Sequence, residues 1–179
     1  MSLNNQVIIT AHAEFLEAAL RELQRLDKNL KSGVLLAPGI ALCSTADVPL
    51  LMRLAAEQRP IFARHLAPVQ KVVPLSNSEQ DVGVLAIAIA DLPAFALLER
   101  GQRFAVQTRF AQSDEAGAAA SSAKRAYSSG YLNQQLALAI AEESGAVESI
   151  KKPQIVISLL CTSNKGYVGI SLARENLSD

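Results

Sequence analysis

KPQIVISLLCTSNKGYVGISLARENLSD, residues 152–179, carries the clearest structural signal in the sequence. An apolar run from Ile155 to Cys161 and a second β-rich run from Tyr167 to Leu172 are separated by turn-forming residues from Ser163 to Gly166. This pattern predicts a β-hairpin that closes a domain. The tail after Leu172 is polar and has no periodicity of its own, which is typical of a linker. We therefore expect residues 174–179 to begin a linker to a further part of a longer protein.

The composition sets the class of protein and excludes one kind of electrostatic attraction. The chain has 179 residues, of which 50% are hydrophobic, enough to bury the core of one domain or of two small ones. Its 17 basic residues balance 17 acidic residues, so the chain as a whole has no net attraction for nucleic acid or an anionic membrane. Any binding to nucleic acid must therefore depend on a local patch.

The cysteines and the apolar stretches indicate a cytoplasmic protein. Cys43 and Cys161 each lie in an apolar, strand-like run and share no metal-binding spacing, so we expect buried free thiols. The N-terminus has no signal-peptide pattern. The longest apolar stretch, residues 82–98, is interrupted by Asp91 and Pro93, so we expect a buried pair of helices in place of a membrane span.

The first part of the sequence, residues 1–75, predicts a ferredoxin-like α+β domain. It contains a strand at 6–10, an amphipathic helix at 13–27, two short β runs within 33–44, a helix that ends near Gln58 and an extended segment at 62–74. The order of these elements is βαββαβ. Helices that cover one face of an antiparallel sheet are the usual solution for this order.

The second part, residues 76–173, predicts the order ααβαββ. Ser76 and Glu79 have the spacing of a capping box before the first helix, and a second short helix begins near Pro93. In the strand that follows, Phe104 and Val106 alternate with two arginines on the opposite face. A long helix is expected from about Ala118 to Glu143, with Ser113 and Asp114 as candidate N-caps, and its buried face contains Leu132, Leu136 and Ile140.

The N-terminal half of this helix is the best local candidate for a contact with nucleic acid. It combines small hydroxyl side chains with two cations, and a helix N-terminus favours an anion such as phosphate. The candidate contacts here and elsewhere in the second part are Ser121, Lys124, Arg125, Ser128, Arg103, Arg109, Lys151, Lys152 and Lys165. Each of these cations taken singly is also explained as an ordinary solubilising surface residue.

The same segments resemble a known family of RNA-modifying enzymes. The strand that ends in QTRFAQ, the helix that contains SSAKRAYSSGYLNQQLALAI and the hairpin KKPQIVISLLCTSNKGYVGISL look like a THUMP domain. The preceding region, which ends in FARHLAPV, looks like the ferredoxin-like domain that accompanies THUMP. The whole resembles the N-terminal part of the FtsJ-like ribosomal RNA 2'-O-ribose methyltransferases. The same module also precedes thiouridine synthases, pseudouridine synthases and other methyltransferases.

This resemblance implies an RNA-binding arm that positions structured RNA, in particular ribosomal RNA, for a catalytic domain beyond residue 179. That domain would use S-adenosylmethionine. The chain itself contains no Gly-rich fingerprint, so we expect it to hold neither that cofactor nor a catalytic residue. His12 and His65 have no cysteine or carboxylate at ligand spacing, so we expect no metal site.

A second class of function is also compatible with the sequence. A ferredoxin-like regulatory or oligomerisation module would bind a small metabolite, or a copy of itself, without touching RNA. The balanced net charge favours this alternative. The aromatic content is only 4%, so if RNA is bound, we expect recognition of its shape and backbone in preference to base identity.

Overall fold

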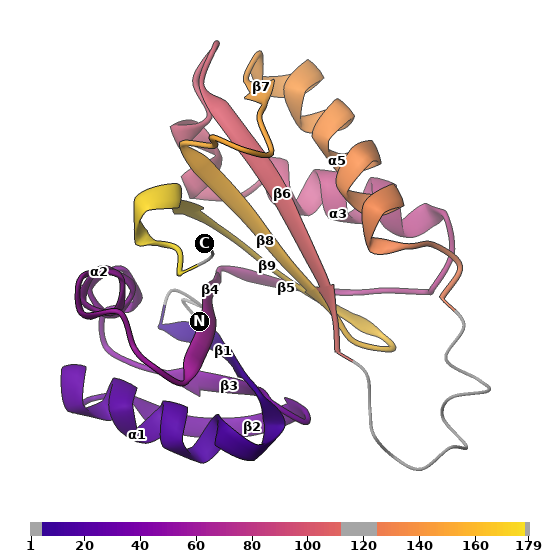
Figure 1. Ribbon diagram of the computed structural model, residues 1–179. Helices are drawn as coiled ribbons and strands as arrows, with labels where there is room; N and C mark the ends of the chain where they lie inside the picture. The colour runs from indigo at the N-terminus through magenta and orange to yellow at the C-terminus, as the bar shows by residue number, and fades with distance from the viewer. Residues whose placement is uncertain (1–4, 112–124, 178–179) are drawn as a thin grey trace.

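The computed structural model describes residues 5–111 and 125–177, which form two β-sheets, each covered by helices on one face (Figure 1). Helices and strands are both present in each half, and the sheets contain mainly antiparallel pairs. This is the α+β class that the sequence predicts.

The first sheet has the strand order β2-β3-β1-β4, and all of its pairs are antiparallel. The chain order βαββαβ agrees with the ferredoxin-like prediction. Its elements are β1 (Gln6–Ala11), η1 (Ala13–Phe15), α1 (Leu16–Leu26), β2 (Lys31–Ala37), β3 (Ile40–Ser44), α2 (Val48–Gln58) and β4 (Ala63–Val69).

Local sequence explains how the two helices of this layer begin and pack. In α1 the side chains of Ala19 and Leu23 are fully buried, one turn apart on the face toward the sheet. At the start of α2 the Asp47 carboxylate accepts a hydrogen bond of 3.0 Å from the Leu50 amide, and Pro49 occupies the first turn, where its missing N–H costs nothing.

The second sheet has the order β5-β9-β8-β6-β7 and mixes antiparallel with parallel pairs. Strands β8 and β9 form the predicted antiparallel hairpin, whereas β6 runs parallel to β8 and to the short β7. Its elements are β5 (Lys71–Pro74), α3 (Gln80–Ala90), η2 (Pro93–Leu97), β6 (Arg103–Phe110), α5 (Ser129–Ser144), β7 (Val147–Glu148), β8 (Ile155–Cys161) and β9 (Lys165–Leu172).

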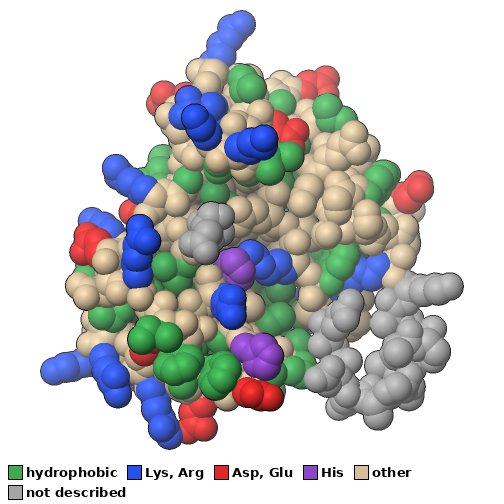
Figure 2. Space-filling view, in the orientation of Figure 1, with side chains coloured by type: hydrophobic (Ala, Val, Ile, Leu, Met, Phe, Trp, Pro, Cys, Tyr) green, Lys and Arg blue, Asp and Glu red, His purple; other side chains and the backbone are tan. Residues whose placement is uncertain are grey.

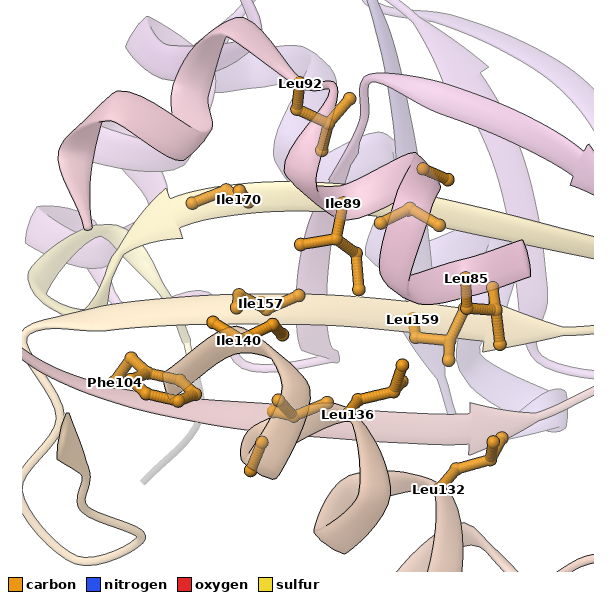
Figure 3. Close-up of a cluster of buried hydrophobic side chains, with 14 of the residues drawn as sticks. Leu85, Ile89, Leu92, Phe104, Leu132, Leu136, Ile140, Ile157, Leu159 and Ile170 are labelled. Carbon is orange, nitrogen blue, oxygen red and sulfur yellow. The ribbon is translucent and has the colours of Figure 1, made fainter. Parts of the chain in front are cut away.

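The larger core lies between this second sheet and helices α3 and α5. Figure 3 shows Leu85 and Ile89 of α3 pointing toward side chains from the sheet and from α5. As predicted, Leu132, Leu136 and Ile140 form the buried face of α5, and Phe104 of β6 is fully buried beneath them. Burial of this apolar surface is the main force that joins helices and sheet.

A smaller apolar cluster joins the two sheets through the faces that carry no helices. Ile8 and Val69 of the first sheet lie in the same cluster as Leu160 and Tyr167 of the second. Beside them, β4 crosses β9 so closely that a Cβ on Gly169 would lie 1.9 Å from the Pro68 carbonyl oxygen. Only glycine allows this approach of two backbones.

The chain passes from one sheet to the other at Gln70. The predicted extended segment 62–74 is two strands, β4 in the first sheet and β5 in the second. The Gln70 amide donates to the Val168 carbonyl at 2.8 Å. Its side chain donates to the Ile170 carbonyl at 2.9 Å and accepts from the Ile170 amide at 2.8 Å. A side-chain amide thus continues the pairing to β9 across the junction.

The described part of the tail, where we expect a linker to begin, packs against the first layer. Ala173–Glu175 forms a short 3-10 helix, η3, which lies against α2. Leu177 then packs against the core cluster of the first sheet. The polar composition of the tail does not predict these contacts, because a single leucine is enough to attach a short tail to an existing core.

Candidate nucleic-acid interface

The predicted cations that the structure describes lie at the two ends of the second sheet. Arg103 stands at the start of β6 beside Lys151 and Lys152, whereas Arg109 stands near its end. At roughly 3.3 Å per strand residue, Arg103 and Arg109 are separated by about 20 Å. The structure therefore does not bring all the predicted residues into one small site, and the two groups could contact only separate phosphates of an extended ligand.

At the first end, hydrogen bonds attach the loop that carries Lys151 and Lys152 to Arg103 at the start of β6. Arg103 Nε donates to the Lys152 carbonyl at 2.9 Å, and the Arg103 amide donates to Gln154 Oε1 at 3.0 Å. Lys151 and Lys152 are exposed in the loop that these bonds tie to β6. Figure 2 shows blue Lys and Arg side chains gathered at this end, at the top of the view. We call Arg103, Lys151 and Lys152 the upper basic patch.

At the other end, Arg109 is half-buried, which corrects the expected two-arginine exposed face. The face of β6 opposite α5 lies toward the first sheet, so Ala105 is buried and Gln107 is partly covered. Burial lowers the pKa of the Arg109 guanidinium. Among the described residues, no carboxylate forms an ion pair with Arg109, which leaves a partly desolvated cation suited to an external anion.

Arg125 has interactions within the fold that explain its position without a ligand. Its Nη2 donates to the Cys161 carbonyl at 3.0 Å and to the Thr162 carbonyl at 2.7 Å. Its guanidinium carbon lies 4.2 Å from the centre of the Phe110 ring, a cation–π distance. Arg125 thus attaches the segment before α5 to the end of β8. Lys165, on the hairpin at the same end, is exposed.

The predicted helix from 118 to 143 begins later in the structure. Helix α5 starts at Ser129, and Ser128 is its N-cap, with Oγ accepting from the Tyr131 amide at 3.0 Å. The helix ends close to the predicted Glu143, at Ser144, and Gly145 is its C-cap with a φ of 77°. Ser121 and Lys124, together with the expected caps Ser113 and Asp114, lie outside the described residues.

A buried carboxylate that the sequence analysis missed organises this end of the sheet. The side chain of Asp81 is 1% exposed and accepts bonds from the amides of Ser76 and Asn77 at 2.8 and 2.9 Å. It also accepts a bond of 2.5 Å from the Tyr127 hydroxyl. The expected capping by Glu79 does not form. The run of short polar residues before Asp81 was the available signal, because an aspartate can bind several preceding amides.

These bonds determine the protonation of both partners. Burial of Asp81 opposes its ionisation, but the hydrogen bonds from Tyr127, Ser76 and Ser78 outweigh that effect and lower the pKa of the carboxyl group. For Tyr127, burial and the bond to the Asp81 carboxylate both raise the pKa of the phenol. Asp81 is therefore ionised and Tyr127 neutral over the physiological range.

The remaining polar candidates have structural explanations. Cys43 and Cys161 are buried free thiols, as predicted. His12 caps η1 by accepting from the Glu14 amide at 3.4 Å. Within the ranges 5–111 and 125–177, no three His, Cys, Asp or Glu side chains gather where they could hold a metal ion. Nor is any helix in those ranges long and apolar enough to cross a membrane.

Comparison with known proteins finds similarity in structure alone. No family model and no curated protein matches the sequence. The crystal structure of TrmN from Thermus thermophilus matches 97% of this chain with 20% identity and a TM-score of 0.69, and the match covers 46% of TrmN.

Two further solved structures match almost as much of the chain. One is a predicted N6-adenine-specific DNA methylase from Listeria monocytogenes, matched over 93% of this chain and 40% of its own, with 16% identity and a TM-score of 0.57. The other is a 4-thiouridine synthetase in complex with RNA and ATP, matched over 94% of this chain and 42% of its own, with 13% identity and a TM-score of 0.51. The chain thus spans less than half of each of the three proteins, and the similarity shows the fold, a ferredoxin-like part followed by a THUMP-like part.

Proposed function

We propose that this chain is the RNA-binding, substrate-positioning part of an RNA-modifying enzyme. The observation that carries the proposal is the match of nearly the whole chain to part of an enzyme solved with bound RNA, the 4-thiouridine synthetase. The likeness to TrmN, which has a higher TM-score, supports the two-part fold on which this proposal depends. In this proposal the chain holds structured RNA while another domain carries out the chemistry.

The finer proposal is methylation of a ribose 2'-hydroxyl in ribosomal RNA, with S-adenosylmethionine bound by the catalytic domain. The hairpin sequence GYVGISL, which resembles the FtsJ-like methyltransferases, supports this choice. The likeness to a predicted methylase supports methyl transfer more generally. The chain would supply neither the cofactor site nor a catalytic residue, and the enzyme would act in the cytoplasm.

The RNA would contact both ends of the second sheet. The upper basic patch offers Arg103 of β6 and two lysines on the loop that hydrogen bonds tie to it. Arg109, which lies at the same end of the sheet as Lys165, is about 20 Å from Arg103 at strand spacing. A ligand with phosphates along its length can use both ends at once, whereas a small anion can use only one. Lys124 and Ser121 remain proposed contacts, and Arg125 and Ser128 would act by positioning the segment before α5.

We propose that the two sheets correspond to two domains. The division into residues 1–75 and 76–173 follows the sequence pattern, but β5 pairs with β9, so we propose to move the boundary to Gln70. Residues 174–179 would lead to the catalytic domain. Because η3 and Leu177 contact the first sheet's layer, this exit would be fixed relative to the first domain.

The test is a titration of a labelled, structured ribosomal RNA fragment with the chain over a range of salt concentrations. Removing two phosphate contacts with Lys151→Ala/Lys152→Ala should weaken binding and reduce the slope of log K against log salt by about 1.4 to 1.8, at 0.7 to 0.9 per phosphate. The matched control, Arg25→Ala/Lys28→Ala, removes the same charge from an exposed part of the first domain and should change the slope little.

Two outcomes would contradict the proposal. If Lys151→Ala/Lys152→Ala changed the slope of log K against log salt as little as the control variant does, RNA would not contact these two lysines. Failure of the unmodified chain to bind RNA, together with dimer formation on addition of a metabolite, would favour the regulatory or oligomerisation module.

A further inference from the structure

A pocket of about 470 Å³ lies where the layers of the two sheets meet, and none of the residues that line it is a proposed RNA contact. One wall comes from α2 of the first layer and the other from η2 and the end of β9 of the second layer. We call it the junction pocket. Its volume is within the range of small-molecule sites, about 300 to 1,000 Å³.

The pocket contains a buried hydroxyl group that has no partner in the described part of the chain. Ser171, on β9, is 6% exposed, and its Oγ forms no hydrogen bond with any described residue. A buried hydroxyl without a partner has lost its hydrogen bonds to water without replacing them, which is unfavourable. A ligand that bonds to this hydroxyl would remove that cost, so Ser171 favours an occupant with a polar group at this position.

Glu175 gives the pocket its charge. It is the one ionisable residue among those that line the pocket, and in the described ranges no Lys, Arg or His forms an ion pair with it. It belongs to η3, the short helix that lies against α2. A carboxylate at the edge of an apolar pocket favours a cation and disfavours an anion such as phosphate.

The other groups restrict the ligand further. The side-chain amide of Gln70 uses one N–H and one oxygen lone pair on the backbone of Ile170, so only its second N–H and second lone pair are left for a ligand. Met52, Pro93 and Leu97 are among the apolar residues that make up most of the wall. The body of the ligand should therefore be apolar.

From this arrangement we propose that the junction pocket binds a small organic ammonium ion with an apolar body. Its ammonium group pairs with the Glu175 carboxylate and donates to the Ser171 hydroxyl, and its apolar body contacts Met52 and the walls of both layers. This site is independent of RNA binding. Because the ligand touches both layers, its binding also stabilises their relative arrangement.

The experiment uses benzylammonium as the probe and benzyl alcohol as its uncharged match. Both are titrated into the chain labelled with ¹³C at the methionine methyl groups, since Met52 is 1% exposed in the pocket wall. We expect benzylammonium to shift the Met52 methyl resonance saturably and to bind about tenfold more tightly than the alcohol, the factor that 1.4 kcal/mol represents. Glu175→Gln should remove this preference, and Ser171→Ala should weaken both probes.

The control is Glu148→Gln, which removes an exposed carboxylate from β7 in the second sheet. It should leave both affinities unchanged. A Met52 resonance that does not move with either probe would overturn the site itself. Equal affinities for the two probes in the unmodified chain, or a preference that survives Glu175→Gln, would overturn the assignment of an ammonium ligand.

Discussion

The Tyr127 hydroxyl donates a 2.5 Å hydrogen bond to the carboxylate of Asp81, although the two residues are far apart in the sequence. Tyr127 precedes α5, and Asp81 lies in the first turn of α3. The bond therefore connects the starts of the two helices that cover the second sheet. It also fixes the end of the sheet where Arg109 and Lys165 lie.

Removing this hydroxyl should reduce stability without changing the fold. In Tyr127→Phe the ring still packs in the core, but the Asp81 carboxylate loses a donor, and hydrogen bonds to charged groups contribute about 1.5 to 3 kcal/mol. We expect the free energy of unfolding in urea to fall by about that amount. Tyr131→Phe is the control, because Tyr131 is 37% exposed. Equal effects of the two variants would refute the structural role of the bond.

The Asp81 network also predicts a dependence of stability on acid. The folded-state pKa of Asp81 lies below its usual value of 3.8, so the stabilisation is present above that value and is lost as the pH falls through the lower folded-state pKa. Unfolding measured from pH 7 downward should show that the difference between the unmodified chain and Asp81→Asn narrows in this acid range. A difference that stays constant with pH would show that ionisation of Asp81 does not matter.

Two glycine substitutions should have opposite effects on stability, because only Gly169 lies where β4 and β9 cross closely. Gly169→Ala places a methyl group 1.9 Å from the Pro68 carbonyl oxygen, so the sheets must separate and stability should fall by more than about 2 kcal/mol, as for severe overpacking. Gly83→Ala adds a methyl group in α3 with no atom within 4 Å and should raise stability by about 0.5 to 1 kcal/mol. Thermal unfolding measures both, and a neutral Gly169→Ala would contradict the described crossing.

Arg109 should contribute to RNA affinity through its charge and geometry. If its half-buried guanidinium binds a phosphate, Arg109→Ala should weaken RNA binding about tenfold, for a charge-assisted contact of about 1.4 kcal/mol. Arg109→Lys should retain part of the affinity because the charge remains. Arg53→Ala, an exposed position on α2, is the control. Unchanged RNA affinity in a folded Arg109→Ala variant would exclude this residue from the interface.

The sequence predicts the elements better than it predicts their ends and contacts. The hairpin of β8 and β9 and the buried face of α5 follow from apolar periodicity, which local patterns record. The late start of α5 at Ser129 does not, because Tyr127 is held outside the helix by a residue in a distant segment, Asp81. A long-range hydrogen bond leaves no periodic signal.

The candidate nucleic-acid interface is likewise predicted only in part from the sequence. The alternation along β6 predicts two arginines on one face, but it does not show that the first sheet lies against that face and partly buries Arg109. Likewise, the sequence does not indicate that the guanidinium of Arg125 donates hydrogen bonds to the carbonyl groups of Cys161 and Thr162. Contacts between layers decide which cations remain available, and they depend on tertiary structure.

The most direct test of the account is whether the chain alone binds structured RNA. Equilibrium titration of a labelled ribosomal RNA stem-loop should give saturable binding that weakens steeply between about 50 and 200 mM salt, as release of counterions from phosphates requires. A chain that shows no saturable RNA binding even at the lowest salt concentration would contradict the proposed RNA-binding function.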